Sequence, residues 1–457
     1  MSKNLTALLS DYIHKQTYTK LSDPDIEKAK LCFLDWVAVT LAGSQEPISD
    51  INFRLIESLG GRAQATLIGR DLKSNLLFAA LMNATSAHAL DYDDVHLDSS
   101  GHPSAPVIPA ILALAEWKGL SGKDFINAFV VGVHVFFSIG AGNMPLHYQE
   151  GWHNTGTVGH IAAAAASARL LNLNKVKIAN AIGAAATQSA GLQTVFGTMG
   201  KPFNAGKAAM DGLLAALLAE GNFTGSDDPL GGKNGFFAVY SSKSDPAAME
   251  KALLGKNFLK GVTFKRYPSC FASHTATDCM LSLKSQYDID PENILEIEGV
   301  VYPKCLDIAA LAEPITGLEG KFSVQFCLAL ALAEGRLEPN SFSDAKVNHS
   351  LLKPIMNKIK LTGDPAYSEG RASKVIIKFQ NGKSIQKKIV LSELMEDTVR
   401  GKSDVVKKYR EIARHFMPAQ KADHLLSNIE SMEQIKNMAD IVSLCRSGAK
   451  KQEVLKR

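Results

Sequence analysis

Apolar residues recur at helical spacing over most of the first half of the chain. The pattern predicts helices over 25–42, 74–90, 105–118, 123–140, 156–172, 175–192 and 205–220. Several of these segments are apolar nearly all round, as in 161–166, where five alanines follow Ile161. Helices of this kind lie in the middle of a bundle, where small residues let the helices approach closely. The first half is therefore predicted to be a helical domain.

The periodicity changes near residue 258. Residues 293–301 alternate between apolar and polar, as strands do, and 374–379 and 384–390 flank an Asn-Gly pair that indicates a β-hairpin. Helices are expected among these strands, at about 271–285, 317–334 and 350–360, and strands are expected only within 258–392. Helical spacing returns after about residue 395, over 403–416, 420–430 and 434–445.

These patterns predict a mainly α protein, with a large all-helical domain and an inserted, smaller α+β lid domain. A chain of 457 residues is too long for one ordinary domain. We expect the helical domain to comprise 1–264 and 395–457, and the α+β domain to comprise 265–394.

The composition excludes several classes of function. The hydrophobic and charged fractions, 46% and 21%, are those of a soluble globular protein, and the net charge of +4 indicates neither nucleic-acid nor membrane binding. The apolar stretch 129–139 is too short to span a bilayer, and the N-terminus lacks the pattern of a signal peptide. The six cysteines form no CxxC motif, which favours reduced thiols and a cytoplasmic location.

The segment between the helices predicted over 74–90 and 105–118 is unusually polar. It holds Asp91, Asp93, Asp94, His96, Asp98 and His102. Carboxylates and imidazoles together perform acid–base chemistry or bind metal. The chain lacks a His-Glu-x-x-His motif and Cys/His zinc spacing, so we predict acid–base chemistry and no metal or cofactor. We expect Ser104 to cap the following helix, which would place His102 at a positive helix end.

Three further side chains stand close to predicted helix starts. They are His153, Lys201 and His274. Helix N-termini carry unpaired N–H groups and attract carboxylates and phosphates. If these helix ends converge with that of His102, they would form a site for a small polyanion.

The motifs together resemble the MmgE/PrpD family. The residues that carry the likeness are 88–94, 102–104, 151–153, 197–202 and 267–270. The resemblance implies a homodimer and catalysis without a metal or organic cofactor. It places Asp91, His102, His153 and His274 at catalytic positions, and Lys201 and Arg266 at substrate-binding positions.

The family includes 2-methylcitrate dehydratase, cis-aconitate decarboxylase and iminodisuccinate epimerase. Two residues depart from the decarboxylase pattern, since Val95 replaces a threonine and Phe326 replaces a tyrosine. The loop between Asp91 and His102 is also one residue longer. These differences count against decarboxylation.

The resemblance implies acid–base chemistry alpha to a carboxylate of a small di- or tricarboxylate. We expect a lyase, above all a dehydratase of the 2-methylcitrate type. An iminodisuccinate-type epimerase and a cis-aconitate-type decarboxylase are alternatives within the same chemistry. A metal-dependent hydrolase and a non-catalytic helical scaffold are alternatives of another class.

Overall fold

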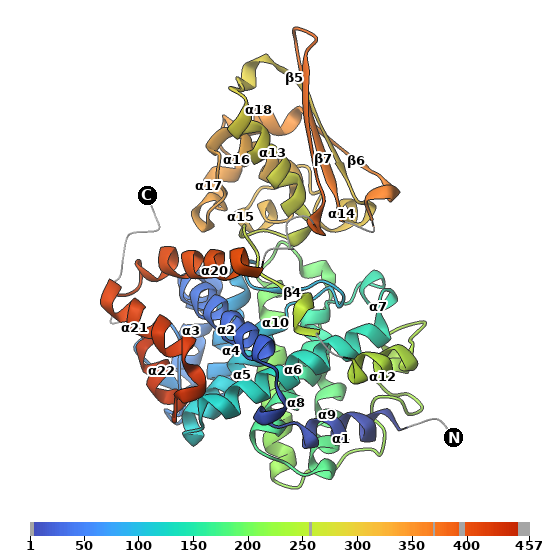
Figure 1. Cartoon of the computed structure of the whole chain (residues 1–457), viewed down its shortest axis with the longest axis vertical. Coiled ribbons are helices and arrows are strands. Elements are labelled where there is room, and N and C mark those ends of the chain that lie inside the picture. The colour runs from blue at the N-terminus through green and yellow to red at the C-terminus, as the bar shows by residue number, and fades with distance from the viewer. Residues whose placement is uncertain (1–3, 256–257, 369–370, 393–397, 447–457) are drawn as a thin grey trace.

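The structure contains two hydrophobic cores, one above the other in Figure 1. It is a computed structural model that describes residues 4–255, 258–368, 371–392 and 398–446. The larger core draws its side chains from Leu5 to Val262 and again from Val405 to Cys445. The smaller core draws them from Ala272 to Ile377. The first and last parts of the chain therefore share one helical body, and the segment between them has a core of its own.

Five long helices form the centre of the helical body. They are α4 (Leu76–Ala89), α5 (Ser104–Lys118), α6 (Gly122–Asn143), α8 (Asn154–Leu170) and α10 (Gly200–Glu220). Glycines let α10 pack closely on its neighbours: a Cβ at Gly212 would lie 2.6 Å from the Ala163 Cβ, and one at Gly206 would lie 2.2 Å from the Thr85 hydroxyl oxygen. This packing brings the end of α4 beside the starts of α8 and α10.

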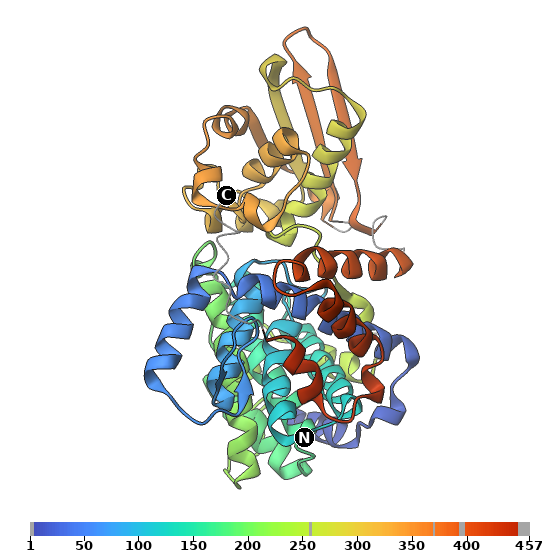
Figure 2. The same ribbon diagram turned by 90° about the vertical axis from the view of Figure 1, so that its left-hand side faces the viewer.

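Further helices surround this centre. They are α1 (Leu5–Lys15), α2 (Asp23–Gly43), α3 (Pro47–Leu59), α7 (Leu146–Gln149), α9 (Lys175–Gln188), α11 (Phe236–Val239) and α12 (Pro246–Leu254). The C-terminal helices α20 (Thr398–Ala413), α21 (Ala419–Glu430) and α22 (Met438–Leu444) return to the helical body and pack on its side (Figure 2).

Helix α6 has the length and the apolar composition of a membrane span, with 22 residues. The prediction that the apolar stretch 129–139 is too short to cross a bilayer is therefore wrong, because the helix continues beyond that stretch at both ends. In the structure, 89% of its most apolar window is buried, as in the core helix of a globular protein.

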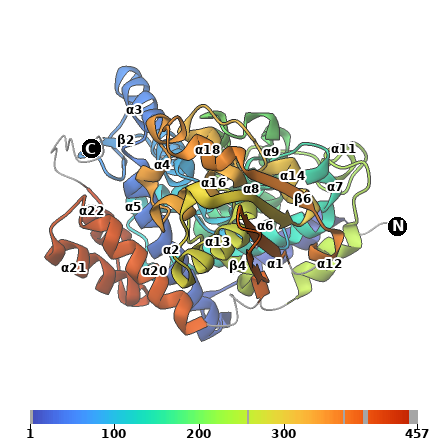
Figure 3. The ribbon, with the colours of Figure 1, turned by 90° about the horizontal axis from the view of Figure 1, so that it is seen from above.

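The upper part is an α+β unit around a four-stranded sheet. The strand order is β6 (Ile359–Gly363), β5 (Ile294–Val301), β7 (Ser373–Phe379) and β8 (Ser384–Ile389). Strand β5 is parallel to β6 and antiparallel to β7, and β7 and β8 form the predicted hairpin. The helices α13 (His274–Gln286), α16 (Val324–Glu334) and α18 (Leu352–Asn357) share its core (Figure 3). Short helices α14 (Pro303–Ile308), α15 (Gly317–Gly320) and α17 (Asp344–Val347) complete it.

The predicted mainly α class is confirmed, but strands are not confined to 258–392. Two-residue strands β1 (Ala65–Thr66), β2 (Lys73–Ser74) and β3 (Val95–His96) lie in the first half of the chain. The helix predicted over 350–360 ends at Asn357, and the strand β6 follows it. The domain boundaries remain predictions.

Strand β3 positions the polar loop. It pairs with β4 (Val262–Thr263), with Val95 opposite Thr263 and His96 opposite Val262. This pairing holds the loop after α4 against the segment that leads into the α+β unit.

Candidate active site

Asp91 lies at the end of α4 with its backbone in the left-handed region, at φ 51°. A non-glycine residue adopts this conformation only where its surroundings fix it, and such residues concentrate at functional sites. The backbone N–H of Asp91 bonds to the His88 carbonyl, and the side chain is buried. The turn thus directs a carboxylate into the interior.

Two lysines contact the same carboxylate oxygen. Lys201 Nζ lies 2.5 Å and Lys265 Nζ 2.7 Å from Asp91 Oδ1, and Lys265 also donates to the Asp91 carbonyl at 2.8 Å. Burial raises the pKa of Asp91, but the two ammonium groups outweigh burial and hold that pKa well below its usual value. Asp91 is therefore ionised and pairs with two cations at one oxygen.

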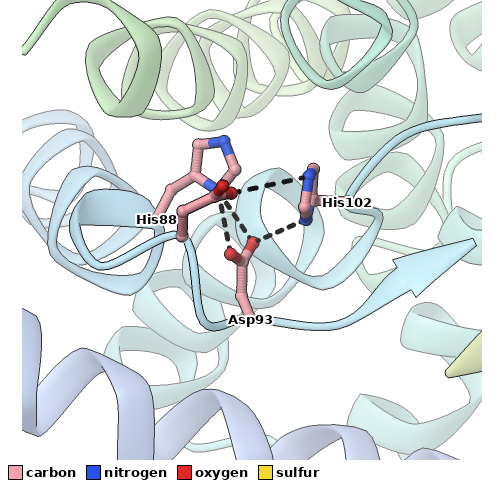
Figure 4. Close-up of side chains that lie close together, drawn as sticks. His88, Asp93 and His102 are labelled. Carbon is pink, nitrogen blue, oxygen red and sulfur yellow. Dashed lines mark hydrogen bonds and ion pairs between the residues drawn. The ribbon is translucent and has the colours of Figure 1, made fainter. Parts of the chain in front are cut away.

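Asp93 lies between two imidazoles (Figure 4). His88 Nδ1 is 2.9 Å from Asp93 Oδ2, and His102 Nδ1 is 3.4 Å from the same oxygen. Burial raises the pKa of Asp93, but the two histidines outweigh it and lower that pKa well below its usual value. Asp93 is placed to orient both rings.

The neighbours of His102 define its tautomer. Nδ1 is 2.7 Å from the Asp94 carbonyl, which only accepts hydrogen bonds, so Nδ1 carries the proton. Nε2 then presents its lone pair, 4.0 Å from Asp91 Oδ1. Burial lowers the pKa of His102 to about 4, although Asp93 opposes this shift. His102 is therefore a neutral imidazole that can take up a proton at Nε2.

His153 is held in the opposite tautomer. The amide nitrogen of Asn204 lies 3.3 Å from His153 Nδ1, and an amide N–H donates, so Nδ1 accepts and Nε2 carries the proton. Burial is the main cause that lowers the pKa of His153 well below its usual value, and nearby Lys201 adds to it. The site thus contains one imidazole that accepts and one that donates.

The predicted cap of α5 is wrong. Pro103 occupies the N-cap position, and Ser104 is the first helical residue. The Ser104 hydroxyl instead donates to Asp94 Oδ2 at 2.5 Å. Burial raises the pKa of Asp94 to about 7, while the bond from Ser104 opposes this shift. The Ser104 side chain therefore hydrogen-bonds within the polar loop and does not cap the start of α5.

A cavity of about 890 Å³ opens beside these groups. Its lining includes four of the residues predicted from sequence: Asp91, His102, His153 and Lys201. The rings of Phe196 and Phe322 also line it and lie 5.3 and 5.1 Å from Lys201 Nζ. Other lining residues, among them Tyr302 and Arg371, belong to the α+β unit, so the cavity lies between the two parts of the structure.

Two predicted residues lie elsewhere. The Arg266 guanidinium pairs with Asp278, and Arg266 is not among the described residues that line the cavity. His274 begins α13, but its buried ring packs on Tyr267 and Phe271, at centroid distances of 5.1 and 5.0 Å, outside the lining. The assignment of both residues to the site remains a prediction that this geometry does not support.

Sequence reasoning missed Lys265, His88 and Asp93. Lys265 immediately precedes Arg266 and lines the cavity, and two adjacent basic residues give no sequence signal of which one faces it. His88 and Asp93 both belong to the motif 88–94, which carries part of the family resemblance. Their spacing of five residues places the imidazole in the last turn of α4 and the carboxylate in the loop that folds back on it.

Four of these side chains could also hold a metal ion. The donor atoms of His88, Asp91, Asp93 and His102 all lie within 4.8 Å of one another. Asp91 Oδ1, however, already accepts from two ammonium groups, which would repel a divalent cation at that oxygen. The donor set therefore fits a protonated hydrogen-bond network better than a metal centre.

Comparison with family models identifies the chain. The MmgE/PrpD N-terminal domain matches residues 7–249, and the MmgE/PrpD C-terminal domain matches residues 267–434. The chain belongs to the MmgE/PrpD family.

Individual relatives include lyases of two kinds. Cis-aconitate decarboxylase from Homo sapiens is 26% identical over 80% of this chain and 78% of that protein. Cis-aconitate decarboxylase from Aspergillus terreus (strain NIH 2624 / FGSC A1156) is 26% identical over 92% of this chain and 91% of that protein. 2-Methylcitrate dehydratase from Salmonella typhi is 24% identical over 78% of this chain and 77% of that protein. The prediction that the protein is a lyase of the MmgE/PrpD family is confirmed.

Proposed function

We propose that the protein is a lyase that acts on a small di- or tricarboxylate by acid–base chemistry alpha to a carboxylate, and specifically a dehydratase of the 2-methylcitrate type. One observation supports this proposal most strongly. Two neutral imidazoles of opposite tautomer line one cavity together with a carboxylate and the two lysines that pair with it. A proton alpha to a carboxylate is weakly acidic, so its removal requires a base and fixed positive charge.

Each of these residues has its own role in the dehydration. His102 Nε2 takes the alpha proton, and the electrons of the C–H bond form the new double bond while the neighbouring C–O bond breaks. The leaving hydroxyl takes up a proton and departs as water. His102 returns this proton from its imidazolium form, so the base is regenerated and Lys201 keeps its charge. His153 Nε2–H contributes a hydrogen bond, and Lys265 with Lys201 neutralises the substrate carboxylate.

Decarboxylation is the second candidate, and the comparisons favour it. The Aspergillus terreus decarboxylase matches 92% of the chain, whereas the Salmonella typhi dehydratase matches 78%. In a decarboxylation the carbanion left by CO₂ must receive a proton. Burial lowers the pKa of His102 to about 4, so the resting imidazole is neutral and lacks the proton that the carbanion requires. Val95 also lines the cavity where the decarboxylase pattern has threonine.

Incubation with a panel of hydroxy-, unsaturated and amino-linked polycarboxylates in D₂O, followed by NMR, separates the candidates. Loss of water from 2-methylcitrate or a related hydroxy acid supports the dehydratase. Loss of CO₂ from cis-aconitate would replace it with the decarboxylase. Alpha-deuterium exchange without a new product would indicate an epimerase. Absence of both turnover and binding throughout the panel would favour the non-catalytic scaffold.

We also propose that the α+β unit acts as a lid. The cavity is lined from both parts, and Lys321 of the α+β unit donates to the Leu90 carbonyl of the helical body at 2.9 Å. A substrate bound there would be enclosed by both parts and shielded from water.

A homodimer and a cytoplasmic location complete the proposal. Helix α3 exposes Ile51, Leu55 and Leu59 at fractions of 46%, 53% and 60%, spaced four residues apart on one face. A stripe of this kind suits contact with a second copy of the chain. Light scattering coupled to size-exclusion chromatography measures the mass, and a monomer at micromolar concentration would contradict the dimer.

A further inference from the structure

The α+β side of the cavity presents a second pair of cations. Lys304, in α14, and Arg371, just before β7, both line it and are half-buried. Arg371 lies close enough to act on Lys304, since burial lowers the pKa of Lys304 and the charge of Arg371 lowers it further. Two like charges held together in a partly desolvated place are unfavourable unless an anion lies between them.

The chain supplies little counter-charge there. Lys304 and Arg371 form no ion pair with any carboxylate in the described part of the chain, whereas Lys201 and Lys265 are both paired with Asp91. Asp98 and Asp307 also line the cavity, and Asp307 opposes the lowering of the Lys304 pKa. Both aspartates are exposed, so their charge is screened by water.

Arg371 is fixed in place despite this lack of a carboxylate partner. Its Nη2 donates to the Leu97 carbonyl at 2.6 Å, a bond that joins the α+β unit to the polar loop. Its backbone is in the left-handed region at φ 45°, which is unusual for a side chain of this size. A guanidinium has five N–H donors, and among the described residues Leu97 alone is given a side-chain hydrogen bond by Arg371.

Two phenols lie near these cations, Tyr148 from α7 of the helical body and Tyr302 from the α+β unit. Both line the cavity, and neither hydroxyl bonds to another described residue. Burial is the main cause that raises the pKa of each phenol, so both are neutral O–H donors. The Lys304 ammonium lies 4.2 Å from the centroid of the Tyr148 ring, which places cation and phenol side by side.

We propose that Lys304, Arg371, Tyr148 and Tyr302 form a distal anion subsite that binds a second carboxylate of the substrate. The inference rests on the proposed function, which places the reacting carboxylate at Lys201 and Lys265. It defines the substrate class more narrowly, as an extended polycarboxylate with an anionic group at each end. Val95 and Phe271 add apolar surface to the same cavity for the uncharged part of such a molecule.

The test uses tricarballylate and its terminal monoamide, which has nearly the same shape but lacks one terminal charge. Calorimetry measures the dissociation constant of each ligand for the wild type, Arg371→Gln, Lys304→Gln and Arg371→Lys. Arg336→Gln is the matched control, because Arg336 is an exposed arginine of the same unit that pairs with Glu338 outside the cavity. Melting temperatures without ligand confirm that the variants are folded.

We expect the wild type to bind tricarballylate at least 10-fold more tightly than the monoamide, the scale of one charge-assisted hydrogen bond. Arg371→Gln removes most of this preference, Lys304→Gln reduces it, and Arg371→Lys and Arg336→Gln preserve it. Equal binding of the two ligands by the wild type overturns the subsite, as does an unchanged preference in Arg371→Gln. Lys201→Ala separates the two proposals: if it weakens neither ligand while Arg371→Gln does, the proposed function fails and the subsite stands.

Discussion

Lys201 Nζ lies 2.5 Å from Asp91 Oδ1, although the two residues are 110 positions apart in sequence. Lys201 is in the first turn of α10 and Asp91 lies two residues beyond the end of α4, so close packing of these helices creates the contact. Both residues are almost fully buried, at 5% and 3% exposure. Since burying a charge without a partner is costly, this pair is a defining feature of the site.

Lys201→Ala should weaken polycarboxylate binding. Ligands that bind only the folded state raise the melting temperature by mass action, and Lys201 supplies one of the two charges that neutralise the reacting carboxylate. Thermal unfolding with and without citrate measures the shift, which should fall by at least half in the variant. Lys207→Ala is the control on the same helix, since Lys207 pairs with Asp211 outside the cavity. An unchanged citrate shift in folded Lys201→Ala would remove Lys201 from the site.

Asp93→Asn tests the positioning of His102. The change keeps the shape of the side chain but removes the carboxylate that favours a proton on His102. The pKa of His102 should therefore fall further, and the acid limb of the pH–rate profile should move to lower pH. Turnover should fall roughly 10- to 100-fold because the ring is less firmly oriented. A merely structural role would lower stability and leave the acid limb where it is.

Acid should destabilise the fold partly through His102. Its folded pKa, about 4, lies below the usual value of 6.5, so the unfolded chain binds the extra proton between these two values. This contribution to stability is complete above pH 6.5 and is lost as the pH falls towards 4. His102→Gln removes it, so the variant should lose less of its free energy of unfolding between pH 7 and pH 5 than the wild type. Urea unfolding at both pH values measures the difference, and equal losses would contradict the buried, neutral imidazole.

Chelation should leave turnover unchanged. Two ammonium groups oppose a cation at Asp91 Oδ1, so we expect the four donors around it to act without metal. Activity is measured after dialysis against EDTA and again after addition of Zn²⁺, Mg²⁺ or Mn²⁺. Loss of activity that a metal restores would favour the metal-dependent alternative.

The fold was largely predictable where periodicity is strong. The helices at α4, α5, α6 and α8 and the β7–β8 hairpin follow directly from apolar spacing and the Asn-Gly turn. The strand β6 was not predictable. Its five residues are mostly exposed, and its position is fixed by parallel pairing with β5, which is far away in sequence.

The site was predictable only in part. Motif residues identified Asp91, His102, His153 and Lys201, all of which line the cavity. Ser104 resembled a helix cap because its competing partner, the Asp94 carboxylate, is ten positions away. Such choices depend on tertiary contacts that local sequence does not contain.

The central claim is that His102 removes the alpha proton, and the most direct measurement compares the wild type with His102→Gln by NMR in D₂O. The wild type should convert a polycarboxylate or exchange its alpha proton. His102→Gln should bind the same ligand within a few-fold but turn it over roughly a hundredfold more slowly, the usual scale for a lost acid–base group. The exposed His424, changed to Gln, is the control and should behave as wild type. Near-wild-type exchange and turnover in a folded His102→Gln variant would contradict the account.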